Sequence, residues 1–156
     1  MTRPRFDDIR TIPLPTDREL IPHLQVLLEE ALRRQVWIMF LDEQSRPLPV
    51  LIPMDVEAEA REGDGAALLQ ALSCVLLDFE NATLVITLER PGPTETMDRD
   101  RRWLRSLREA CVASGRAFRG PFLMLGDQIT QVPPDDYVGI PLVYSDDDEY
   151  NDQGSF

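Results

Sequence analysis

The side chains best suited to bind a charged group lie between residues 82 and 115. Glu89 and Arg90 end an apolar run and precede a loop formed by Pro91, Gly92 and Pro93. A carboxylate next to a guanidinium at a strand end can pair with a charged or polar partner. The ordinary structural alternative is a strand end that leads into a solvated loop. Glu89 and Arg90 are therefore candidate binding residues, with both interpretations kept open.

Three arginines follow this loop at helical spacing. Asp98 can cap a helix that ends near Ser114, and Arg101, Arg105 and Arg108 then share one side of it. This stripe is a candidate binding surface for a protein, and a weak nucleic-acid-binding module is an alternative that it suggests. A charged outer face on an amphipathic helix is the commoner explanation of such a pattern.

Among the possible metal ligands, only the carboxylates lie close together in the sequence. Pairs such as Asp98 and Asp100, or the run Asp146–Glu149, have the oxygen chemistry that Mg²⁺ and Ca²⁺ prefer. The run lacks the glycine and the spacing of an EF-hand loop, which favours a solvated acidic tail. A divalent-metal-dependent hydrolase with carboxylate ligands is thus an alternative only, and we expect no metal and no cofactor. His23 stands alone, without a partner for acid–base chemistry.

The periodicity along the chain predicts a mixed α/β domain. Apolar alternation and runs predict the following order: a helix from Thr16, a strand pair at 36–41 and 48–54, a helix at 66–80, a strand at 84–88, a helix at 98–114, and a strand pair at 118–125 and 129–132. This α-ββ-α-β-α-ββ order indicates a single-domain mixed sheet flanked by helices, with an arm at 1–15, a domain at 16–132 and an acidic tail at 133–156.

Composition narrows the class of protein further. The formal net charge is −12, and this disfavours nucleic acid as a partner. No apolar run is long enough for a membrane span and no secretory signal precedes the domain, so we expect a cytoplasmic protein. Cys74 and Cys111 are interpreted as small buried hydrophobic residues rather than a disulfide. All basic residues are arginine, which is typical of a high-GC bacterium.

Three segments resemble the RadC-type JAB/MPN (JAMM metalloprotease-like) domain over about residues 16–132. WIMFLDEQSRPLPV is similar to its first hairpin, LVITLERPGPTETMDRDRRWLRSLREACVASG to its metal-loop strand and following helix, and FLMLGDQITQV to its closing hairpin. The resemblance implies a cytidine-deaminase-like three-layer sandwich.

The residues that hold the metal in this family are not present. Its motif is His-x-His-Pro with a later Asp, and the equivalent segment here is Leu88-Glu89-Arg90-Pro91. The later Asp corresponds to Arg101, or to Asp100 with one deletion, and the catalytic Glu to the apolar pair Leu51–Ile52. A hydrolytic zinc needs about three nitrogen or oxygen ligands and an open position for water.

These observations favour a degenerate domain of this type, a pseudo-enzyme that acts as a protein-interaction or regulatory module. The partner protein is not identified, and the oligomeric state, a homodimer included, stays open. Pro49 and Pro53 predict that the strand at 48–54 lies at a sheet edge.

Overall fold

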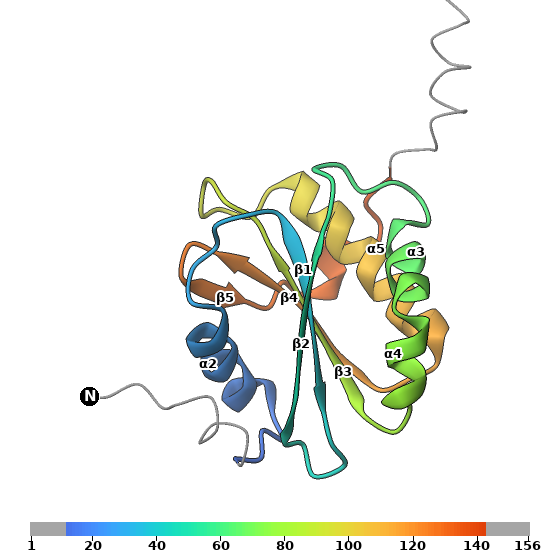
Figure 1. Cartoon of the computed structure of the whole chain (residues 1–156). Coiled ribbons are helices and arrows are strands. Elements are labelled where there is room, and N and C mark those ends of the chain that lie inside the picture. Colours follow the sequence, from blue (N-terminus) through green and yellow to red (C-terminus); the bar gives the residue numbers. More distant parts are fainter. Residues whose placement is uncertain (1–11, 143–156) are drawn as a thin grey trace, which may run out of the picture.

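Five strands form one mixed sheet in the order β2-β1-β3-β4-β5 in the computed structural model, which describes residues 12–142 (Figure 1). The elements are α2 (Asp17–Leu28), β1 (Gln35–Leu41), β2 (Pro47–Asp55), α3 (Asp64–Ala71), α4 (Ser73–Asp78), β3 (Thr83–Glu89), α5 (Asp98–Ser114), β4 (Phe118–Leu125), β5 (Gln128–Thr130) and a 3₁₀ turn (Pro134–Asp136). The predicted arm at 1–15 lies mostly outside the described residues.

The strand directions make the sheet mixed, as predicted. Strand β1 runs antiparallel to both β2 and β3, and β4 runs antiparallel to β5. Strands β3 and β4 are parallel and are joined by the long helix α5. A parallel pair needs such a crossover because the chain must return to the end of the sheet at which the first strand begins before it can form the second.

Helices cover both faces of the sheet, which gives three layers (Figure 1). Alternate residues of β1 point to opposite faces. Ile38 and Phe40 belong to the apolar cluster that includes α3 and α5, whereas Met39 and Leu41 pack with α2. The prediction of a mixed sheet flanked by helices is therefore confirmed at this level.

Helix α5 follows its predicted bounds closely. Its buried side chains include Trp103, Leu104, Leu107 and Cys111, which recur at helical spacing and face the sheet. Gly115 ends the helix in the left-handed region, with a φ of 73°. Glycine suits that position because it has no β-carbon to clash. The N-cap is Met97 rather than the predicted Asp98, which is the first helical residue.

Two sequence-based expectations about the elements need correction. The single helix predicted at 66–80 is two helices, α3 and α4, separated at Leu72, whose ψ of 9° departs from helical geometry. The predicted tail from Pro133 is not wholly outside the domain. Tyr137 is 2% exposed and belongs to the main core cluster, so packing continues beyond Val132.

The edge prediction for the second strand is confirmed, since β2 is the outermost strand on its side of the sheet. Pro22 lies inside α2, so the helix continues through a residue that lacks a backbone donor. Within residues 12–142, no helix has the length and apolar character needed to cross a membrane.

Candidate functional site

Glu89 organises the corner where β3 ends beside the start of β1. One carboxylate oxygen accepts the backbone N–H groups of Leu32 and Arg33 at 2.8 and 3.0 Å. The other accepts the Gln35 amide at 3.1 Å and the Trp37 indole N–H at 2.6 Å. With four donors, this buried carboxylate has the compensation that its removal from water requires. All four hydrogen bonds therefore connect Glu89 to β1 and to the segment that precedes it.

Arg90 forms a buried ion pair with Asp100 at the start of α5. Its Nε and Nη2 donate to the two carboxylate oxygens, each at 2.8 Å, in a two-bond arrangement. The exposed fractions of the two side chains are 3% and 0%. Two parallel N–H···O bonds between a guanidinium and a carboxylate are a strong form of charged hydrogen bonding, because the two planar groups fix each other's orientation.

The loop between β3 and α5 wraps around the same guanidinium. Nη2 donates to the Glu95 carbonyl at 2.7 Å, and Nη1 donates to the Pro93 carbonyl. Asp100 also accepts the Met97 backbone N–H at 2.8 Å, which satisfies one free donor at the helix start. Arg90 therefore fixes the loop and, through Asp100, the beginning of α5.

These contacts show what the predicted candidates Glu89 and Arg90 do in the fold. Both residues are 2% exposed and both are fully engaged with internal partners. The structure brings together Arg90 and Asp100, whereas Arg101, the other position considered for the later Asp, pairs outward with Asp98 at 2.9 Å. Their proposed role in binding a partner stays a prediction. Because both side chains are buried, a partner would contact them only if this corner of the fold opened.

The arginines of the α5 stripe are also paired within the protein. Arg105 forms an ion pair with Glu109 at 2.7 Å and donates to the Ile140 carbonyl. The Arg108 guanidinium lies 5.8 Å from the ring centre of Phe118. Burial raises the pKa of Tyr137, and Arg108 opposes that shift through its charge and a hydrogen bond. The segment after β5 thus covers part of the stripe.

Carboxylate ligands do not converge in the described part of the chain. Residues 12–142 contain no group of three or more His, Cys, Asp or Glu side chains arranged to hold a metal ion. Asp98 and Asp100, the pair considered above, are directed to Arg101 and Arg90. The run Asp146–Glu149 lies outside the described residues.

The isolated titratable residues fit structural roles. His23 is 6% exposed, and burial lowers its pKa to about 4. Cys111 is buried, which raises the pKa of its thiol to about 12. Cys74 is free and exposed, which corrects the expectation that both cysteines are buried.

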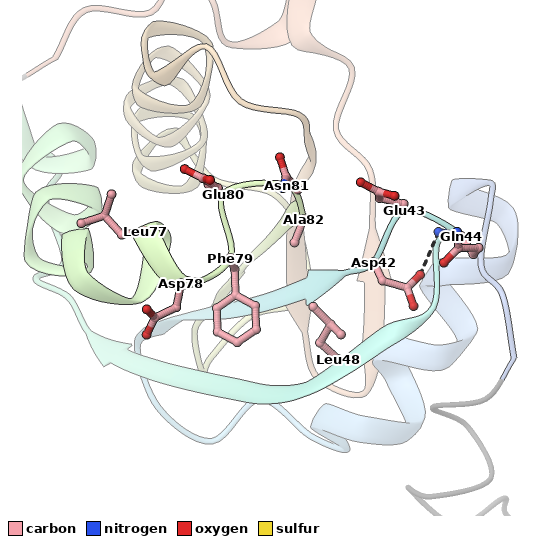
Figure 2. Close-up of a pocket in the computed structure, with 10 residues that line it drawn as sticks. All are labelled: Asp42, Glu43, Gln44, Leu48, Leu77, Asp78, Phe79, Glu80, Asn81 and Ala82. Atoms are coloured by element: carbon pink, nitrogen blue, oxygen red, sulfur yellow. Dashed lines mark hydrogen bonds between the residues drawn. The ribbon is translucent and has the colours of Figure 1, made fainter.

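A groove that the sequence did not predict lies between the β1–β2 turn and the end of α4 (Figure 2). Its cavity volume is about 410 Å³. The lining side chains are acidic or polar at the rim and apolar inside, namely Asp42, Glu43, Gln44, Leu48, Leu77, Asp78, Phe79, Glu80, Asn81 and Ala82. The only sequence signal was the mixture of acids with Leu77 and Phe79 at the end of the helix predicted at 66–80, and nothing in it linked 77–82 to 42–48.

No protein-family model matches this chain, and no curated protein matches it.

Proposed function

We propose that this chain is a non-catalytic protein-interaction or regulatory module with a degenerate RadC-type JAB/MPN-like fold. The single observation that carries the proposal is the Arg90–Asp100 pair. It occupies the corner to which the resemblance assigns a cation, and its two side chains are 3% and 0% exposed. A fixed positive charge already neutralises the carboxylate there, and both partners are withdrawn from solvent.

The register of the sheet supports the JAB/MPN-like interpretation. Glu89 lies opposite Gln35, and Leu88 lies opposite Val36, so the corner adjoins the first hairpin. Leu51 and Ile52 lie on β2, one strand further along the sheet. The resemblance assigns the metal loop to the corner and the catalytic glutamate to Leu51–Ile52, and Ile52 lies opposite Ile38, three residues along β1 from Gln35. The corner holds an internal ion pair, and the β2 position is apolar.

The chemistry of the corner favours binding over catalysis. A hydrolytic metal site keeps an open position for water beside its ligands. Arg90 instead donates to Asp100 and to the carbonyls of Pro93 and Glu95. These contacts stabilise the loop. A partner protein would therefore bind to the exposed surface of the domain and not to this corner.

Affinity purification of the tagged full chain from its own cells, after mild crosslinking, tests this function. We expect a protein partner in near-stoichiometric amount with the wild type. Recovery of no protein partner in crosslinked material would contradict the proposal.

A metal titration addresses the hydrolase alternative. Thermal unfolding of the full chain is followed with Zn²⁺, Mg²⁺ or Ca²⁺ added separately. A ligand that binds only the folded state raises the melting temperature in a saturable way. We expect no such rise. A saturable rise together with metal-dependent hydrolysis would replace the proposed function with the alternative.

A further inference from the structure

The groove between the β1–β2 turn and α4 has a preformed apolar floor. Phe79 stacks on Phe40 with ring centres 4.8 Å apart and an angle of 15° between the rings. Figure 2 shows Phe79 and Leu48 between the turn and the end of α4. Leu77, a further lining residue on α4, is 71% exposed, so apolar surface at the groove is in contact with water. An aromatic floor of this kind suits an apolar side chain of a ligand.

The backbone under the groove is held by Arg116. Its guanidinium donates to the carbonyls of Leu76 and Ala82 at 3.2 and 3.3 Å, and also to the carbonyl of Phe79. The same group lies 5.8 Å from the ring centre of Phe40. These hydrogen bonds fix the end of α4, which forms one side of the groove.

The rim of the groove carries exposed negative charge, and Arg116 interacts electrostatically with one of its members, Glu80. Asp42 uses its carboxylate within the turn, where it accepts the backbone N–H groups of Gln44 and Arg46, each at 2.9 Å. Glu43, Asp78 and Glu80 are exposed and form no hydrogen bond or ion pair with another residue of the described range. No basic side chain lines the groove.

We propose that this groove binds a basic segment of a partner protein, in which one apolar side chain lies between arginine or lysine residues. The inference rests on the proposed function and names the partner's chemistry. The apolar side chain contacts Phe79 and Leu48, and the cations on either side pair with Glu43, Asp78 and Glu80. The cavity volume of about 410 Å³ lies in the usual range for small-ligand pockets, about 300–1,000 Å³, and is enough for one side chain of a bound segment.

Charge complementarity selects this occupant over an acidic or neutral one. The chain has a formal net charge of −12, so a cationic segment is attracted before contact and an acidic one is repelled. Pairs at an exposed rim contribute little each, about 0–1 kcal/mol, so affinity also needs the apolar contact. The ligand must therefore carry both features together.

The test uses fluorescence anisotropy with the full chain and a labelled, end-blocked Arg-Arg-Leu-Arg-Arg peptide at about 50 mM salt. The groove variant is Glu43→Gln/Asp78→Asn/Glu80→Gln. A matched variant, Glu62→Gln/Asp135→Asn/Asp136→Asn, removes the same charge from exposed positions outside the groove. We expect binding by the wild type, a loss of at least about tenfold in the groove variant, and a change below about twofold in the matched variant.

Peptide controls separate the apolar contact from general attraction. Replacement of the central leucine by serine is expected to weaken binding severalfold, and the Glu-Glu-Leu-Glu-Glu peptide is expected not to bind. Equal losses in the two triple variants, no effect of the serine replacement, or no binding by the wild type would each overturn the proposal. So would binding that appears only in an Arg3→Ser/Arg5→Ser variant, because the chain's own N-terminus would then be the occupant.

The groove and the proposed function can fail separately. A partner that co-purifies equally with the wild type and the groove variant would refute the groove while leaving the interaction module in place. If no partner is recovered at all, the proposed function itself fails.

Discussion

Two charged residues that follow each other in the sequence have different structural tasks. Glu89 connects the end of β3 to the segment before β1, and Arg90 connects it to the loop and to α5 through Asp100. From the sequence, Glu89 and Arg90 were candidate binding residues at a strand end. Burial was not predictable, since most charged residues are exposed and only the partners supplied by distant segments make burial tolerable.

The Arg90–Asp100 pair yields a test of its energetic role. We expect Arg90→Met and Asp100→Leu each to destabilise the protein by about 3–5 kcal/mol, because each leaves a buried charge without its partner. The double variant is expected to lose about 2–3 kcal/mol less than the sum of the two, since no isolated charge remains. Urea unfolding of the four proteins measures this coupling. Strict additivity would show that the pair does not act as a unit.

His23 predicts a specific pH dependence. Its pKa is about 4 in the folded protein and 6.5 in the unfolded chain, so between these values only the unfolded chain takes up the proton. The free energy of unfolding therefore falls as the pH is lowered through this window. The loss due to His23 is about 2.5 kcal/mol between pH 7 and about pH 4.5.

A His23→Leu variant isolates that contribution from the carboxylates, which the two proteins share. We expect the stability difference between variant and wild type to grow by about 2.5 kcal/mol in favour of the variant over the same pH interval. Chemical denaturation at each pH measures it. A difference that does not change with pH would mean that His23 titrates normally in the folded protein.

Among the elements, α3 and α5 meet at a point where only glycine fits. The Gly65 N–H donates to the Ser106 hydroxyl at 2.8 Å. A β-carbon at residue 65 would lie 2.6 Å from the Ser106 carbonyl carbon, which is backbone and cannot rotate away. The close approach of these two helices is thus set by one residue without a side chain.

We expect Gly65→Ala to destabilise the protein by about 2–3 kcal/mol despite alanine's higher helix propensity, because the overlap forces the helices apart. Gly139→Ala is the matched control, since a β-carbon there meets nothing within 4 Å. Thermal unfolding compares the two. A Gly65→Ala protein as stable as the control would show that the helices separate without cost.

Across the whole molecule, residues after β5 close the α5 side of the core. Tyr137 is 2% exposed and packs in the main cluster, whereas the neighbouring Val138 is 50% exposed. The domain therefore extends beyond residue 132, where the acidic composition of the following segment had suggested an unpacked tail. A single aromatic side chain can anchor such a segment because it buries a large apolar area.

This anchor gives a prediction at the scale of the molecule. Tyr137→Ala is expected to lower the free energy of unfolding by about 3–5 kcal/mol, as large aromatic truncations in a core do. Val138→Ala should change it by less than about 0.5 kcal/mol. Urea unfolding monitored by tryptophan fluorescence measures both. Equal effects would indicate that the segment does not contribute to the core.

The sequence alone determined the mixed α/β class, most strand positions and the bounds of α5. Those features depend on local periodicity and on turn and cap residues, which a stretch of the chain carries by itself. Only the tertiary structure decided the partners of Glu89 and Arg90, the inclusion of Tyr137 in the core, and the acidic groove. Each joins segments distant in sequence, such as residues 42–48 and 77–82, and their contacts depend on how the sheet and helices pack.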